Sequence, residues 1–199
     1  TLRAMDDLVQ EGKILYTGVS NWAAWQIEKA LGISRRENLA RFEIVQPMYN
    51  LVKRQAEVEI LPMAEAENLG VISYSPLGGG LLTGKYGKDK RPDKGRLVEK
   101  ETYIARYGVE EYYQIAEEFS IHAQEKGAAP ASLAIAWVMS NPAITAPIIG
   151  ARNLEQLQES LGALDINLTE EWRKEITELS IPPLLATDRL EEQKNMSYF

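Results

Sequence analysis

The feature that most constrains the fold of this chain is a short apolar run followed by a segment of helical apolar spacing, an order that occurs four times. The runs predict strands at Lys13–Ser20, Phe42–Gln46, Val71–Tyr74 and Ala146–Ile149. The first of them suits a strand buried on both faces. Strands that alternate with helices form parallel sheets, so we expect an α/β fold, either doubly wound or a barrel.

Capping residues and breakers set the helices that we expect around these strands. An opening helix starts within the first residues and ends at Gly12. Asn153 and Thr169 are typical N-caps, and Gln156 completes a capping-box pattern with Asn153. Pro62 is expected to kink its helix or to delay its start. The other expected helices are Ala23–Leu31, Gln55–Asn68, Glu110–Lys126, Pro130–Ser140, 153–164 and 169–179.

The number of strands decides between the architectures. A complete (β/α)8 TIM barrel takes about 250 residues, whereas four units and a long connection, Ser75–Val109, already use the 199 residues present. We therefore expect a single domain over 1–199 that is half of a barrel, with a polar tail at 181–199. The first residue is not Met and the apolar stripe begins at Leu2, as in a fragment. The two outer strands need a missing N-terminal half or a second chain to cover their edges.

Composition excludes several classes of function. The chain has no Cys and one His, so we expect no disulfide, no thiolate nucleophile and no metal site. A net charge of −7 argues against nucleic acid as a partner. No apolar stretch approaches the roughly 18 residues of a membrane span, and no signal peptide opens the chain. We therefore expect no membrane partner and a cytoplasmic location.

The carboxyl ends of the predicted strands carry the candidate chemistry, because ligands of both α/β architectures bind there. Three of the four ends offer hydroxyl or amide groups, and Tyr74 offers a flat ring. This set suits a planar ligand that bears a carboxamide. The residues at the four ends are Ser20-Asn21, Gln46, Tyr74-Ser75 and Gly150-Ala151-Arg152.

Two of these ends also suit phosphate. The loop SPLGGGLLTGKY, Ser75–Tyr86, places three glycines after a strand and adds the charge of Lys85. Glycines let backbone N–H groups approach an anion, although the loop matches neither G-x-G-x-x-G nor the Walker motif. After the fourth strand, Arg152 stands at a helix N-terminus, where the helix dipole and the guanidinium both favour a second phosphate.

Five segments together resemble the C-terminal half of an aldo-keto reductase, in order and over nearly the whole chain up to Ile181. The resemblance implies a (β/α)8 barrel whose fifth to eighth strands are present here. It also implies an NADP-dependent oxidoreductase that reduces aldehydes or ketones, with a small carbonyl compound as substrate. The segments are GVSNW (18–22), VQPMYN (45–50), SYSPLGGGLLTGKY (73–86), ASLAIAWVMSNPAI (131–144) and PIIGARNLEQLQES (147–160).

The resemblance implies a role for each site residue. Ser20, Asn21 and Gln46 would bind the nicotinamide carboxamide, and Tyr74 would stack on the nicotinamide ring. The pyrophosphate region would be held by Ser75, Leu77, Gly78, Gly79 and Lys85. The strand-end Gly150 leads to Arg152 and Gln156, which would meet the 2′-phosphate side, with Glu159 and Ser160 near the adenine. The family more often has Asn at position 160.

The family's catalytic Asp, Tyr, Lys and His lie upstream of this sequence, so no catalytic residue is assigned here. Two other functions stay open: a non-catalytic NADP-binding regulatory subunit or inactive fragment, and a barrel that binds a phosphorylated metabolite. Simpler structural roles also stay open for single residues: helix capping by Ser20-Asn21 and by Gln156, a satisfied strand-end polar group at Gln46, core packing of Tyr74, a plain turn at 78–80, and a surface ion pair of Arg152. His122 is expected to be a solvated helix residue.

Overall fold

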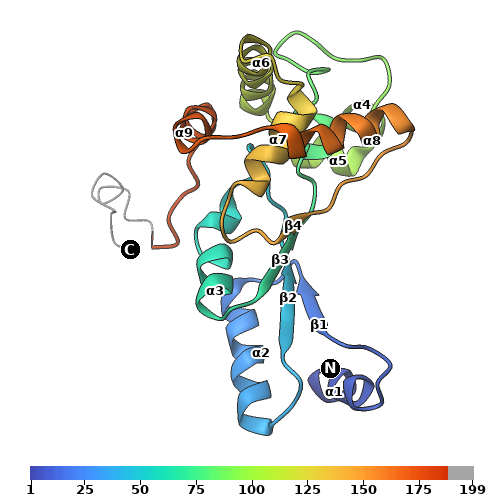
Figure 1. Cartoon of the computed structure of the whole chain (residues 1–199), viewed down its shortest axis with the longest axis vertical. Helices are drawn as coiled ribbons and strands as arrows, with labels where there is room; N and C mark the ends of the chain where they lie inside the picture. Colours follow the sequence, from blue (N-terminus) through green and yellow to red (C-terminus); the bar gives the residue numbers. More distant parts are fainter. Residues whose placement is uncertain (188–199) are drawn as a thin grey trace.

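A computed structural model describes residues 1–187 of the chain and shows a parallel sheet of four strands in the order β1-β2-β3-β4 (Figure 1). The strands are β1 (Thr17–Ser20), β2 (Phe42–Gln46), β3 (Gly70–Ser73) and β4 (Ala146–Pro147). Ser20 pairs with Gln46 and Ser73 with Pro147, so the carboxyl ends of neighbouring strands lie at one edge. The α/β class expected from the element order is confirmed.

One face of the sheet is packed against helices. These are α2 (Ala24–Glu37) and α3 (Ile60–Ala66), which run alongside the strands, whereas α1 (Leu2–Gln10) has no buried residue and lies near the start of β1 (Figure 1). Val45 and Val71 point to the packed side and are almost fully buried in one core cluster with Ile27 and Leu61. Their neighbours on the opposite face, such as Ile44 and Ile72, are only partly buried. The expected burial of the first strand on both faces is wrong, because β1 alternates between buried and exposed positions.

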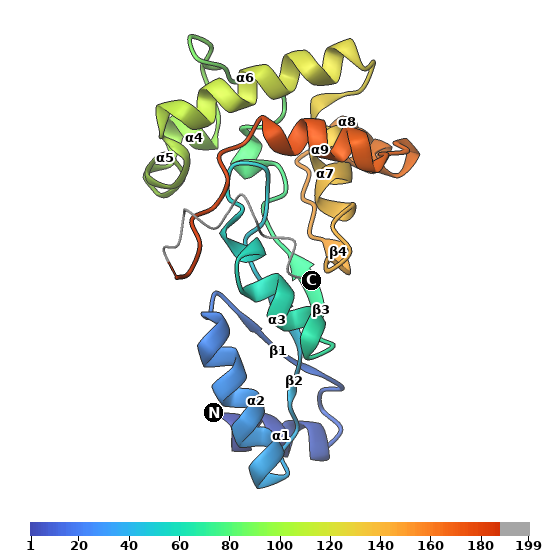
Figure 2. The same ribbon diagram turned by 90° about the vertical axis from the view of Figure 1, so that its left-hand side faces the viewer.

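The remaining helices gather beyond the carboxyl ends of the strands (Figure 2). Helix α7 is their centre, with eight consecutive buried residues from Ala131 to Val138. The Trp137 ring stacks on Tyr49, with 5.2 Å between the ring centroids. These helices are α4 (Arg96–Glu99), α5 (Glu101–Tyr107), α6 (Glu110–Glu125), α7 (Pro130–Met139), α8 (Leu154–Leu161) and α9 (Glu170–Glu178).

The outer strands are shorter than their apolar runs. The backbone N–H groups of Lys13 and Ile14 both donate to Leu8 O and so complete the end of α1. Leu15 and Tyr16 are then 80% and 71% exposed, and β1 starts only at Thr17. At the other edge, β4 has two residues, although the Ile148 N–H still donates to Ser73 O at 2.7 Å. Hydrophobic side chains alone therefore do not define the length of an edge strand.

Two predicted helices differ in their bounds. Helix α2 continues six residues past Leu31 and ends at Asn38 in the left-handed region, with φ of 52°. The helix expected at Gln55–Asn68 divides into a 3₁₀ turn, Gln55–Glu57, and α3. Pro62 lies in the first turn of α3, where an N–H has no partner within the helix, so the proline delays the helix rather than kinking it.

The expectation that His122 is solvated is wrong. Its side chain is 16% exposed, and its Nε2 accepts a hydrogen bond of 2.8 Å from the indole N–H of Trp172 on α9. His122 thus joins α6 to α9. Most of the predicted tail lies outside the described residues. No helix of the described part combines the length and the apolar character needed to cross a membrane.

Candidate functional site

The polar residues at the ends of β1, β2 and β3 form a connected hydrogen-bond cluster. The Ser20 hydroxyl donates to Gln46 O at 2.9 Å, and the Asn21 amide donates to the Ser20 hydroxyl at 3.0 Å. The Tyr74 hydroxyl donates to Asn21 Oδ1 at 2.6 Å. We call Ser20, Asn21 and Tyr74, with the end of β2, the strand-end cluster. The structure therefore brings Ser20, Asn21 and Tyr74 together as the sequence predicts, with Gln46 joined to them through its backbone carbonyl.

Helix capping does not account for Ser20 and Asn21. The N-cap of α2 is Ala23, and its N–H donates to Gln26 Oε1 at 2.9 Å. Asn21 instead has a left-handed backbone with φ of 59°, a conformation that Asn tolerates better than most residues. Its side chain is thereby turned toward Tyr74. The cluster also borders a hollow that Asn21, Gln46 and Tyr74 line together with apolar residues of α2 and α3.

The loop after β3 is a tight turn of left-handed residues. Ser75, Gly78 and Gly79 have φ of 58°, 58° and 71°, and the Gly78 N–H donates to Ser75 O at 2.9 Å. A short 3₁₀ helix over Gly78–Gly80 follows. A Cβ at Gly79 would come within 2.8 Å of the Tyr103 ring, so glycine is required there by space as well as by conformation. We call Ser75–Gly80 the glycine turn.

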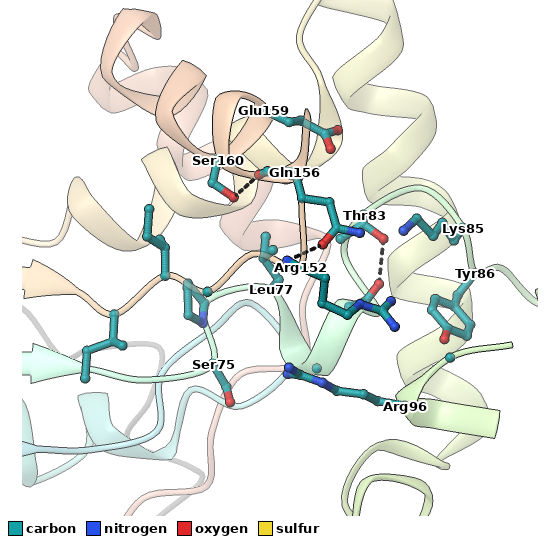
Figure 3. A pocket seen from close by; sticks show the side chains of 18 of the residues that line it. Ser75, Leu77, Thr83, Lys85, Tyr86, Arg96, Arg152, Gln156, Glu159 and Ser160 are labelled. Atoms are coloured by element: carbon teal, nitrogen blue, oxygen red, sulfur yellow. Dashed lines mark hydrogen bonds between the residues drawn. The ribbon is translucent and has the colours of Figure 1, made fainter. Parts of the chain in front are cut away.

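Beside the glycine turn lies a pocket of about 290 Å³ that is bordered by residues of α4, α7 and α8 (Figure 3). It adjoins the strand-end cluster through Ser75, the residue after Tyr74. Nine of the predicted cofactor residues line it: Ser75, Leu77, Gly79, Lys85, Gly150, Arg152, Gln156, Glu159 and Ser160. Gly78 does not, because within the glycine turn it is the buried residue. We call this space the phosphate-side pocket.

The phosphate-side pocket is strongly cationic. Lys85, Lys94, Arg96 and Arg152 line it, against one carboxylate, Glu159. Figure 3 shows Arg152 and Arg96 reaching into the same space, with Lys85 beside them and Glu159 further along α8. Among the described residues Arg152 forms no ion pair, so the alternative of a surface salt bridge has no support there. Such a surface suits a ligand with more than one phosphate.

Helix α8 presents its N-terminus to this pocket. Asn153 Oδ1 accepts from the Gln156 N–H at 2.9 Å, which confirms Asn153 as N-cap. The Gln156 side chain accepts from the Arg152 N–H at 3.1 Å, one residue earlier than a capping box requires. Ser160 is buried and donates to Gln156 O at 2.8 Å. Gln156 therefore fixes the backbone at Arg152, while the Ser160 hydroxyl is engaged within its own helix.

Some lining residues were not among the predicted site residues. Arg96, Lys94, Thr83 and Tyr86 belong to the long connection, whose path the sequence does not specify. Burial raises the pKa of the Tyr86 hydroxyl, and the charge of Arg152 acts against this shift. Arg91, a further cation of this connection, does not line the pocket, and its guanidinium lies 3.4 Å from the centre of the Tyr113 ring on α6.

The comparison with known protein families agrees with this arrangement. The profile of the aldo/keto reductase family matches residues 1–181. The chain belongs to the aldo/keto reductase family. The match covers the whole sheet, the glycine turn and α8, and so every residue of the site.

Individual relatives support the same assignment. The uncharacterized oxidoreductase YrpG of Bacillus subtilis is 38% identical over 168 residues, which cover 84% of this chain and 49% of that protein. A putative voltage-gated potassium channel subunit beta of Schizosaccharomyces pombe is 36% identical over 192 residues, covering 92% and 55%. Norsolorinic acid reductase B of Dothistroma septosporum is 32% identical over 177 residues, covering 88% and 43%. The chain spans about half the length of the curated relatives that it matches.

Proposed function

We propose that the chain is the cofactor-binding half of an NADP-dependent oxidoreductase that reduces aldehydes or ketones to alcohols. The observation that carries this proposal is the continuity of two surfaces: a hydroxyl and amide cluster that suits a carboxamide lies directly beside a four-cation pocket that suits phosphates. An extended NADP molecule has a carboxamide at its nicotinamide end, followed by the pyrophosphate and then the 2′-phosphate of the adenosine ribose.

The pocket passes a test of fit for phosphate groups. A Cβ built at Gly80 or at Gly150 meets no atom within 4 Å, so both backbones border open space. The cations that surround this space come from the loop after β3, from α4 and from the segment before α8. Phosphates held between separate elements bridge those elements, which favours an ordered site over a single surface contact.

Each group of site residues would bind a different part of the cofactor. Ser20, Asn21 and Gln46 would orient the carboxamide of the cofactor, which supplies a hydride when bound. Tyr74 would stack on the nicotinamide ring and cover one side of it. Ser75, Leu77, Gly78, Gly79 and Lys85 would hold the pyrophosphate, and Arg152 with Gln156 the 2′-phosphate side. Glu159 and Ser160 would lie near the adenine.

The catalytic proton donor is proposed to lie outside this chain. Reduction of a carbonyl needs a tuned acid near the reacting oxygen. The described chain's imidazole, His122, is engaged by Trp172 on an outer helix. The proposal therefore includes four further strands, from the same polypeptide or from a second chain, that complete a (β/α)8 barrel with these four as strands five to eight. A single domain over 1–199 in the cytoplasm is part of the same proposal.

One observation favours a second function. Two relatives named as potassium channel β subunits match 92% and 83% of the chain, and a named reductase matches 88%. The alternative is therefore a regulatory subunit that binds NADP without turnover. A barrel that binds a phosphorylated metabolite is a third reading of the same cations.

The test is an NADPH titration followed by a reductase assay with a panel of aldehydes, on this chain and on the full natural polypeptide. The reductase proposal expects nicotinamide fluorescence to change on binding, with turnover only when all eight strands are present. Binding without turnover in the full polypeptide would support the regulatory subunit, and no binding would support the metabolite barrel. Turnover of about 1 s⁻¹ or more by this chain alone would place a proton donor within it and contradict the assignment.

A further inference from the structure

The buried side chain of Asn50 connects the end of β2 to the glycine turn. Asn50 is fully buried, and its amide N–H group donates to Ser75 O at 2.9 Å. The same amide nitrogen lies 3.3 Å from the hydroxyl of Tyr107, and Asn50 Oδ1 accepts from the Val52 N–H at 3.2 Å. All hydrogen-bonding groups of this amide are therefore engaged.

The acceptor of that bond is the atom on which the glycine turn closes. Ser75 O accepts from the Gly78 N–H at 2.9 Å as well as from Asn50. Ser75 has a left-handed backbone, which is unfavourable for a residue with a Cβ and needs support from its surroundings. The bond from Asn50 fixes the direction of this carbonyl, and with it the start of the turn.

Helix α5 completes the arrangement from the opposite side. Tyr103 and Tyr107 are four residues apart and so lie on one face of this helix. The Tyr103 ring packs so close to Gly79 that a Cβ there would lie 2.8 Å from it. The Tyr107 ring lies 3.7 Å from a Cβ placed at Gly78. The Tyr107 hydroxyl also donates to Met48 Sδ at 3.5 Å. Burial raises the pKa of the Tyr107 hydroxyl, so it stays protonated as a donor.

We propose that Asn50 and the Tyr103/Tyr107 pair are positioning residues that hold the glycine turn in its cofactor-binding form. Because Tyr103 and Tyr107 belong to α5, the glycine turn keeps this form only while α5 is packed against it. None of the three lines the pocket, so their effect on a ligand passes through the turn. This inference rests on the proposed function of the phosphate-side pocket.

The test uses Asn50→Asp, which keeps the shape but replaces the donating amide by an acceptor, and Tyr107→Phe, which removes only the hydroxyl. The chain offers matched controls in Tyr49→Phe and Asn141→Asp. Tyr49 is also fully buried, its hydroxyl bonds Glu57 at 2.6 Å and Asn141 at 3.2 Å, and both residues lie away from the pocket. The controls therefore remove comparable buried hydrogen bonds elsewhere in the core.

Two measurements are made on the full natural polypeptide, well below its unfolding temperature. The first is hydrogen exchange, without ligand, of a peptide that contains Gly78–Leu82. The second is the dissociation constant of NADPH. We expect faster exchange in both test variants, with a weakening of NADPH binding of about tenfold for Asn50→Asp and about threefold for Tyr107→Phe. Both controls should leave exchange in this peptide and NADPH binding unchanged.

The outcomes separate this inference from the proposed function. Unchanged exchange in the test variants would overturn the positioning role whether or not NADPH binds. Faster exchange together with unaltered NADPH affinity would overturn it as well, because the turn would then not control the ligand. A wild-type protein that binds no NADPH would contradict the proposed cofactor, while the exchange data would still decide whether Asn50 and Tyr107 hold the turn.

Discussion

The strand-end cluster and the phosphate-side pocket lie side by side but are built in different ways. The Ser20, Asn21 and Tyr74 side chains of the cluster bond mainly to one another and are accessible to solvent. The glycine turn beside the pocket is fixed from beneath by Asn50, Tyr103 and Tyr107, of which Asn50 and Tyr107 are fully buried. A ligand can exchange bonds with the cluster at little structural cost, whereas the pocket is a rigid product of core packing. Substitutions that disturb the packing beneath the glycine turn should therefore lower stability, whereas substitutions in the cluster should leave stability nearly unchanged.

The largest effect on stability is expected for Gly79→Ala. Its matched control is Gly127→Ala, since both glycines have φ of 71° but a Cβ at Gly127 meets nothing within 4 Å. The control should cost about 1 kcal/mol for the left-handed backbone. Gly79→Ala should cost about 2–4 kcal/mol, because the methyl group also displaces the Tyr103 ring. The free energy of unfolding in urea measures both, and equal values would show that the turn is not rigidly packed.

Arg152→Ala is expected to have the next largest effect, on cofactor selectivity. A charge-assisted contact contributes about 1.5–3 kcal/mol, so NADPH should bind roughly 10 to 100 times more weakly. NADH, which lacks the 2′-phosphate, should lose much less. Arg35→Ala is a suitable control, since Arg35 forms a surface ion pair of 3.0 Å with Glu67. Comparable losses for the two cofactors, measured by fluorescence titration of the full natural polypeptide, would reject the role of Arg152.

A third variant, His122→Ala, lies in neither region. It leaves the indole N–H of Trp172 without its acceptor and should lower the free energy of unfolding by about 1–2 kcal/mol. NADPH affinity should not change. Glu175→Ala removes an exposed ion pair of 2.9 Å with Lys126 and a 4.0 Å contact with His122 Nε2, but leaves the bond between His122 and Trp172 in place, and should cost less than about 0.5 kcal/mol. A loss of cofactor affinity in His122→Ala would show that packing between α6 and α9 also controls the pocket, and not only the residues beneath the glycine turn.

The residues of both regions could be predicted in part from the sequence. Strand ends in a parallel sheet share one edge, so Ser20, Gln46 and Tyr74 are predictable as neighbours from the element order alone. Glycine, lysine and arginine near strand ends likewise point to the pocket. Family motifs then add the expected roles, although they do not show which side chains bond to one another.

The path of the long connection, Ser75–Val109, could not be predicted from the sequence. Helices α4 and α5 are short, and their positions depend on contacts that are distant in sequence, such as Tyr107 with Asn50 at 3.3 Å. Local propensity carries no information about such contacts. The burial of His122 depends on such a contact as well, since its partner Trp172 lies 50 residues further along the chain. Residues 13–16 do not form a strand because the N–H groups of Lys13 and Ile14 donate to Leu8 O at the end of α1.

The smallest effects are expected at Tyr74, where they test the cluster itself. Tyr74→Phe removes the hydroxyl bond to Asn21 at 2.6 Å but keeps the ring. Because solvent can replace that bond, the free energy of unfolding should change by less than about 1 kcal/mol. If the ring stacks on the nicotinamide, Tyr74→Phe should bind NADPH nearly as well as the wild type, whereas Tyr74→Ala should bind it about 2 to 10 times more weakly. Equal weakening in both variants, in fluorescence titrations of the full natural polypeptide, would mean that the hydroxyl rather than the ring contacts the cofactor. Tyr74 would then hold the nicotinamide end by exchanging its hydrogen bond to Asn21 for one to the cofactor, and stacking on the ring would contribute little.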